Sequence, residues 1–170
     1  MESSNKSSSQ SWFILATPDL IVGPALGKDI NKVLVKLDEL QATGVTGVLN
    51  LCGFSHTKEQ IWVPDYGMDY KFIDVFFLSL LNIQNLKEAV SFIDSQIAKG
   101  GKAYVHCSFG RDRSPMMIAM HLIYKGMSPN EAKEFLKSKN IEISTGQDCL
   151  ERLQGWHDSG RQGEMLDFHA

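Results

Sequence analysis

The sequence predicts a single α/β domain in which helices flank a central, mostly parallel mixed sheet. Three observations support this fold class. Short apolar runs alternate with longer segments of helical periodicity along the chain. The 170 residues are enough for one hydrophobic core. The apolar fraction of 43% and the charged fraction of 22% are ordinary for a globular protein, so the composition suits such a core.

The first half of the chain predicts three strands and one long helix. Residues 12–16 and 20–22 are apolar runs around a Thr-Pro-Asp turn and predict two strands. Residues 29–42 predict a helix, because apolar residues recur there at the spacing of one helical face. Residues 45–51 predict a buried strand. Residues 52–69 contain glycine and proline and predict a long loop with room for a short helix.

The second half begins with two more strands and the helix between them. Residues 70–75 predict a strand, residues 86–97 an amphipathic helix, and residues 102–106 the next strand. A short loop follows, and then a helix from Pro115 to about residue 125. Proline suits the first helical position, because the amide hydrogen that it lacks has no partner there.

Two further helices are expected near the C-terminus. Ser128 and Glu131 have the spacing of a capping box and predict a helix that extends to about Lys139. Residues 147–157 predict the last helix.

The composition also limits the classes of function. We expect the domain to span residues 12–158, between a flexible Ser-rich tail of residues 1–11 and a C-terminal tail of residues 159–170. The formal net charge of −3 argues against broad electrostatic binding to nucleic acid or to an anionic membrane. No apolar run reaches the length needed to span a bilayer, so we expect no membrane insertion. We also expect a monomer.

Residues 106–114 carry the strongest functional signal. They read His-Cys-Ser-Phe-Gly-Arg-Asp-Arg-Ser, with five residues between Cys107 and Arg113. The segment follows a predicted strand and precedes a predicted helix. A tight loop that leads into a helix leaves backbone N–H groups without partners in the chain, and such groups bind oxyanions. The sequence therefore predicts an oxyanion-binding loop with a cysteine at its start.

Each fixed residue type in this loop suits that chemistry. The amide dipoles and Arg113 favour a negative charge, so we expect the pKa of Cys107 to fall to roughly 3.5–7.5. Arg113 can donate two hydrogen bonds to two oxygens of one phosphate. Gly110 lets the backbone approach the ligand without a Cβ clash. Ser114 is expected to donate a hydrogen bond to the sulfur, and His106 to hold loop carbonyls rather than act as a base.

The loop resembles the signature of cysteine-dependent protein phosphatases, and most closely that of the dual-specificity group, His-Cys-x-x-Gly-x-x-Arg-Ser/Thr. The resemblance extends over roughly residues 12–158. It implies hydrolysis of phosphate monoesters through a cysteinyl-phosphate intermediate. It also implies that the substrate contacts loop residues Ser108, Phe109, Gly110, Arg111, Asp112 and Arg113.

The general acid is the open question. The family usually supplies an aspartate about thirty residues before the cysteine, but that position falls near Phe77 here. Asp74 lies close by and would reach the pocket if its strand ended early. Asp112, inside the loop, is the alternative that we prefer, because a carboxyl group beside a bound dianion favours its protonated form. Without a dedicated acid, aryl phosphates, phosphoanhydrides or RNA 5′ ends would be the favoured substrates.

The substrate class also stays open. Phosphotyrosine, phosphoserine and phosphothreonine proteins are the first expectation from the resemblance. Phosphoinositides or inositol phosphates come second, because Arg111 and Asp112 resemble the loop ending of lipid-directed members of the superfamily. A third alternative is a pseudophosphatase that binds phosphorylated ligands without turnover.

The cysteine and histidine residues suggest a compartment and exclude a metal. The count of three cysteines is odd, and Cys107 lies in the loop, so we expect a reducing compartment: the cytoplasm, with the nucleus as an alternative. The five histidines lack metal-ligand spacing. We therefore expect neither a metal nor another cofactor.

Overall fold

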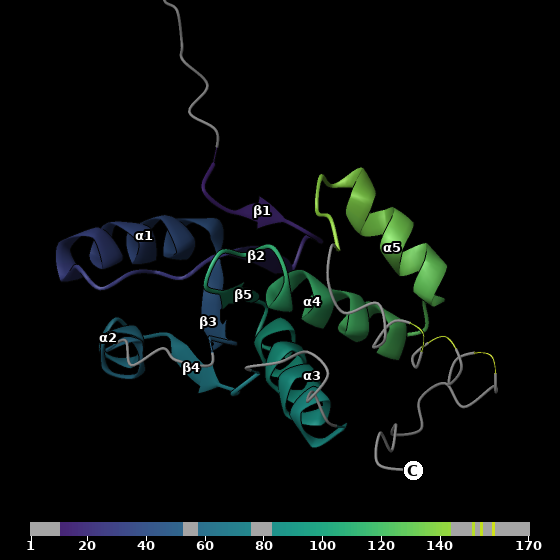
Figure 1. Ribbon diagram of the computed structural model, residues 1–170. Coiled ribbons are helices and arrows are strands. Elements are labelled where there is room, and N and C mark those ends of the chain that lie inside the picture. Colours follow the sequence, from purple (N-terminus) through teal and green to yellow (C-terminus); the bar gives the residue numbers. More distant parts are fainter. Residues whose placement is uncertain are drawn as a thin grey trace, which may run out of the picture.

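The computed structural model describes residues 11–52, 58–75 and 83–143, together with residues 151, 154 and 158. Within that part of the chain, a sheet of five strands runs in the order β1-β2-β5-β3-β4 (Figure 1). The strands are β1 (Ile14–Leu15), β2 (Leu20–Pro24), β3 (Val45–Asn50), β4 (Asp69–Phe72) and β5 (Lys102–Cys107). Among the described strands, β1 runs antiparallel to its neighbour β2, and the other pairs are parallel. The mostly parallel mixed sheet is therefore confirmed.

Helices cover both faces of this sheet (Figure 1). One face is packed by α1 (Ile30–Thr43) and α2 (Glu59–Asp65), and the other by α3 (Ile83–Ala98), α4 (Arg113–Tyr124) and α5 (Pro129–Ser138). Each face has its own cluster of buried apolar side chains. The central strand β5 contributes to both clusters, which places its C-terminal end in the middle of the molecule.

The helix ends follow the signals in the sequence. The side chain of Asp29 accepts a hydrogen bond from the backbone of Asn31 and so caps α1. Gly44 ends that helix with a φ of 97°, the left-handed conformation that glycine adopts without strain. The predicted capping box of α5 is also present: Ser128 and Glu131 each bind the other's backbone amide.

Three boundaries differ from the prediction. Strand β4 ends at Phe72 rather than at residue 75, although the amide of Ile73 still donates to the carbonyl of Asn50 at 3.0 Å. Helix α4 begins at Arg113, two residues before the predicted start. Pro115 is therefore the third helical residue, where its missing amide hydrogen still costs no helical bond. The predicted strand at residues 12–16 is reduced to β1.

Some expectations fall outside the described residues. They include residues 1–10 and 159–170, the position near Phe77 and most of the predicted last helix, of which residues 151 and 154 are described and helical. Among the described helices, none combines the length and apolar character that a bilayer span requires.

Candidate active site

The loop of residues 108–112 connects β5 to α4 at the carboxyl edge of the parallel strands. At this edge Pro24 of β2 pairs with Cys107, and Asn50 of β3 pairs with His106. The chain segments that leave β2 and β3 therefore flank the loop on its two sides. Ligands of open parallel sheets bind at this edge, where the strands end.

Cys107 lies at the base of the loop with its sulfur surrounded by donors. The residue is 2% exposed, and its Sγ lies 3.3 Å from the hydroxyl oxygen of Ser114. Burial raises the pKa of the thiol, but hydrogen bonds from the Ser114 hydroxyl and from the amides of Ser114, Asp112 and Gly110 outweigh it and lower the pKa to about 7. A substantial fraction of the cysteine is therefore thiolate at neutral pH, as the sequence predicted.

Arg113 folds back along the loop. Its Nη2 donates to the hydroxyl oxygen of Ser108 at 2.8 Å. Its Nη1 donates to the backbone carbonyl of Leu51 at 3.0 Å and to that of Val75 at 3.4 Å. The guanidinium thus lies beside the residue that follows Cys107, and two neighbouring strand ends fix its orientation.

Gly110 is required by packing against β2. Its φ is 70°, and a Cβ added there would lie 2.5 Å from the carbonyl carbon of Gly23 and 2.9 Å from the nitrogen of Pro24. The amide of Ala25 donates to the carbonyl of Ser108 at 3.3 Å and ties the same two segments together. We expected this glycine to let the loop backbone approach the ligand without a Cβ clash. The structure gives a further reason for glycine here: the space that a Cβ would fill is taken by the backbone of β2.

The remaining loop residues face outward. Phe109 is 77% exposed, and Ser108 and Arg111 are also exposed. Phe109, Gly110 and Arg111 form one side of a groove of about 430 Å³. The opposite sides come from β1 and from the segment after α5, with Ile14 and Ile141 among the apolar residues.

The two candidate acids occupy different surroundings. Asp112 is half-buried directly before α4, and its side chain does not cap that helix. Asp74 is exposed and lies beyond the end of β4, between the buried Ile73 and Val75. The early end of β4 is the condition under which we expected Asp74 to approach the pocket. The carbonyl of Val75 does reach Arg113, so this segment borders the loop.

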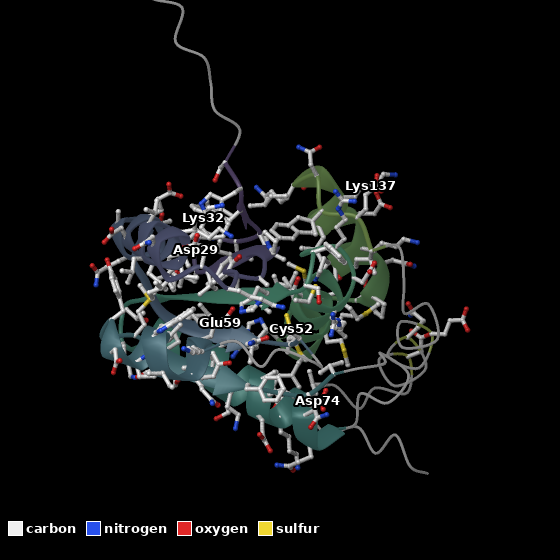
Figure 2. All side chains as sticks on the ribbon, turned by 60° about the vertical axis from the view of Figure 1, so that its left-hand side comes forward. Asp29, Lys32, Cys52, Glu59, Asp74 and Lys137 are labelled. Atoms are coloured by element: carbon white, nitrogen blue, oxygen red, sulfur yellow. The ribbon has the colours of Figure 1, made fainter. Side chains whose placement is uncertain are left out.

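His106 belongs to a buried polar cluster that the sequence did not predict. Its Nε2 lies 2.8 Å from Oε2 of Glu59, and its Nδ1 lies 3.7 Å from Sγ of Cys52. Figure 2 shows Cys52 and Glu59 near each other at the centre of the molecule. The imidazole therefore does not hold loop carbonyls, as we had expected, because both ring nitrogens face these two side chains. Glu59 escaped notice because it lies in a segment that the sequence presents as a loop.

Alkylation of Cys107 tests its ionisation. We expect the rate of reaction with iodoacetamide to rise with pH around a midpoint near 7, because the thiolate is the reactive form. Ser114→Ala should move the midpoint upward, since one donor to the sulfur is lost. The rate for Cys107→Ala gives the background from the other cysteines. A midpoint near the ordinary thiol value of about 8.5 in the wild type would contradict the donor arrangement.

Gly110→Ala tests the packing of the loop on β2. We expect a free energy of unfolding lower by about 2–4 kcal/mol, because the methyl group meets backbone atoms that cannot move aside. Gly100→Ala is the matched control: its φ is 76°, and nothing lies within 4 Å of the added Cβ. It should lose only about 1 kcal/mol from backbone strain. Equal losses in urea denaturation would show that the close contact is absent.

Comparison with known proteins agrees with this geometry. The family model of the dual specificity phosphatase catalytic domain matches residues 30–159. Dual specificity protein phosphatase 1B of Arabidopsis thaliana is 30% identical over 126 residues, which cover 72% of this chain and 71% of that protein. Phosphatidylglycerophosphatase and protein-tyrosine phosphatase 1 of Mus musculus is 38% identical over 76 residues, 44% of this chain and 39% of that protein.

The fold also has solved counterparts. The crystal structure of PTPMT1 in complex with PI(5)P superposes with a TM-score of 0.69 at 26% identity, over 88% of this chain and 96% of that one. The matched region contains the whole loop from Cys107 to Ser114 and three of the five described strands, β3, β4 and β5.

 The chain therefore belongs to the dual specificity phosphatase family of cysteine-dependent phosphatases.

Proposed function

We propose that this protein hydrolyses phosphate monoesters on phosphotyrosine, phosphoserine and phosphothreonine proteins, with Cys107 as the nucleophile. The observation that carries the proposal is the ring of donors around its sulfur. The backbone amides of Gly110, Asp112 and Ser114 and the hydroxyl of Ser114 hydrogen-bond to Sγ and lower the pKa of the thiol to about 7 despite burial. The same amides can bind the oxygens of a phosphoryl group placed above the sulfur.

In the first step, the thiolate of Cys107 attacks phosphorus. A P–S bond forms while the P–O bond to the leaving group breaks, and an aspartic acid gives its proton to the leaving oxygen. The loop amides and Arg113 hold the three non-bridging oxygens. Arg113 suits this role because its guanidinium already lies beside the loop, at 2.8 Å from Ser108.

In the second step, water attacks the phosphorus of the cysteinyl-phosphate. The same aspartate, now ionised, takes a proton from the water as the new P–O bond forms and the P–S bond breaks. The sulfur leaves with the electron pair of the P–S bond. Ser114, 3.3 Å from that sulfur, can donate a hydrogen bond to it and so make it a better leaving group.

We propose Asp112 as the acid and keep Asp74 as the alternative. Asp112 is half-buried and precedes Arg113 directly, so its carboxyl group belongs to the loop itself. Asp74 is exposed, but its neighbour Val75 contacts Arg113 through its carbonyl.

The pH dependence of kcat for a poor leaving group separates the two acids. We expect Asp112→Asn to lower kcat by about 10²–10⁴-fold and to remove the basic limb of the profile, because no proton is then available for the leaving oxygen. Asp74→Asn should keep that limb. The reverse pattern would assign the role to Asp74. Unchanged profiles in both variants would mean that neither residue is the acid.

The proposal of a protein substrate has two supports. The Arabidopsis relative is named a protein phosphatase. The groove beside the loop has an apolar lining from Ile14, Phe109 and Ile141, which suits side chains that flank a phosphorylated residue. Phe109 is 77% exposed, so a bound peptide can cover it.

A phosphoinositide is the second candidate substrate. One mouse relative is named a phosphatidylglycerophosphatase as well as a protein-tyrosine phosphatase. The PTPMT1 structure contains PI(5)P and has a similar fold. Arg111 is exposed at the rim of the loop, where a cation favours a headgroup with more than one phosphate.

A substrate panel tests the choice. We expect release of phosphate from phosphopeptides and from a small aryl phosphate, and no release from either by Cys107→Ser. Phe109→Ala should raise KM for the peptides several-fold and leave the aryl phosphate unaffected. Hydrolysis of phosphoinositide vesicles without peptide hydrolysis would favour the second candidate. Binding of tungstate without turnover of any substrate would indicate a phospho-ligand binding module instead.

A further inference from the structure

The side chain of Glu59 is fully buried at the start of α2. Its Oε1 accepts a hydrogen bond from the amide of Leu26 at 3.3 Å. Its Oε2 lies 3.2 Å from the side-chain nitrogen of Asn50 and 2.8 Å from Nε2 of His106. A carboxylate accepts from all three groups. It therefore joins the chain segments at the ends of β2, β3 and β5, below the loop.

A buried carboxylate needs a cation or several donors to offset its desolvation, and His106 can serve as that cation. Burial lowers the pKa of the imidazole, but hydrogen bonds to Cys52 and Glu59 and the electrostatic interaction with these two groups outweigh this and raise the pKa to about 9. The ring is thus protonated at neutral pH. It donates to Glu59 and, at 3.7 Å, to the sulfur of Cys52.

A series of hydrogen bonds connects this ion pair to Arg113 through the turn after β3. The side-chain oxygen of Asn50 accepts from the amide of Cys52 at 2.8 Å and so fixes the turn after β3. Leu51, in the middle of that turn, donates its amide to the carbonyl of His106 at 2.9 Å. Its own carbonyl accepts from Nη1 of Arg113 at 3.0 Å. The orientation of the Arg113 guanidinium therefore depends on the position of the turn after β3, which these hydrogen bonds fix.

We propose that Glu59 is a positioning residue: its ion pair with His106 orients the guanidinium of Arg113 for phosphate binding. The inference rests on the proposed function, in which Arg113 holds the phosphoryl oxygens. Loss of the ion pair frees the turn after β3 and with it the Leu51 carbonyl. The phosphate-binding geometry then loosens although no residue of the loop has changed.

Several titratable groups surround the pair. They are Cys52, Lys36 on α1, Tyr70 on β4, and Tyr104 and Cys107 on β5. Burial raises the pKa of Tyr70 to about 12 and that of Tyr104 well above its ordinary value, so neither ionises below pH 10. Cys107 ionises near pH 7. Burial lowers the pKa of Lys36, so this lysine can also contribute to a change of affinity at alkaline pH. The titration of the His106 imidazole therefore has to be measured directly.

Tungstate binding at pH 7.5 and 9.5, measured by calorimetry, tests the proposal. Tungstate is a tetrahedral dianion at both values and needs no turnover. At pH 7.5 we expect Glu59→Gln to weaken binding about tenfold, which corresponds to about 1.4 kcal/mol. Asp65→Asn, an equal change of charge at an exposed position of the same helix, should leave it unchanged. Glu59→Asp, which keeps the charge, should restore part of the affinity.

At pH 9.5 the wild type should lose about threefold in affinity, because His106, with a pKa of about 9, is then about three-quarters neutral. The affinity of Glu59→Gln for tungstate should fall little further between pH 7.5 and pH 9.5. The imidazole resonances of His106 should titrate at the midpoint of the wild-type loss, and at lower pH in Glu59→Gln. Affinity that stays constant while this imidazole titrates would overturn the proposal, even if the variant failed to fold. Turnover of an aryl phosphate by the wild type tests the proposed function separately.

Discussion

The backbone amides of the loop can surround one sulfur because the loop rests directly on β2. Gly110 carries no side chain, so its backbone approaches Gly23 and Pro24 to a distance that a Cβ would forbid. The bond from Ala25 to Ser108 adds a second tie. With the loop held in this way, the amides of Gly110 and Asp112 donate to Cys107 and, together with the hydroxyl and amide of Ser114, outweigh the effect of burial on the pKa of the thiol. The acidity of the thiol therefore depends in part on that contact.

The local features of this protein were accessible from the sequence. The spacing of Cys107, Gly110, Arg113 and Ser114 predicted the loop and the contact between Ser114 and the sulfur. Helical periodicity and capping residues predicted α1 and α5 to within one or two residues. These signals lie within a few positions of one another in the chain, and they act through backbone geometry that neighbouring residues determine.

The features that the sequence did not disclose depend on contacts between distant segments. Glu59 and His106 are 47 positions apart, and nothing near Glu59 marks it as buried. The reason for Gly110 likewise lies in β2, far back along the chain. The start of α4 at Arg113 was missed because proline suits several positions of the first helical turn.

The two outermost strands of the described sheet are short. β1 has two residues and β4 has four, whereas β2, β5 and β3 in the interior have five or six. Short outer strands offer few free backbone groups to a strand of another molecule. The loop with the reactive thiol leaves the strand farthest from either border. A disturbance at the rim of the sheet, such as fraying of β1, therefore has to pass through β2 before it reaches the sulfur.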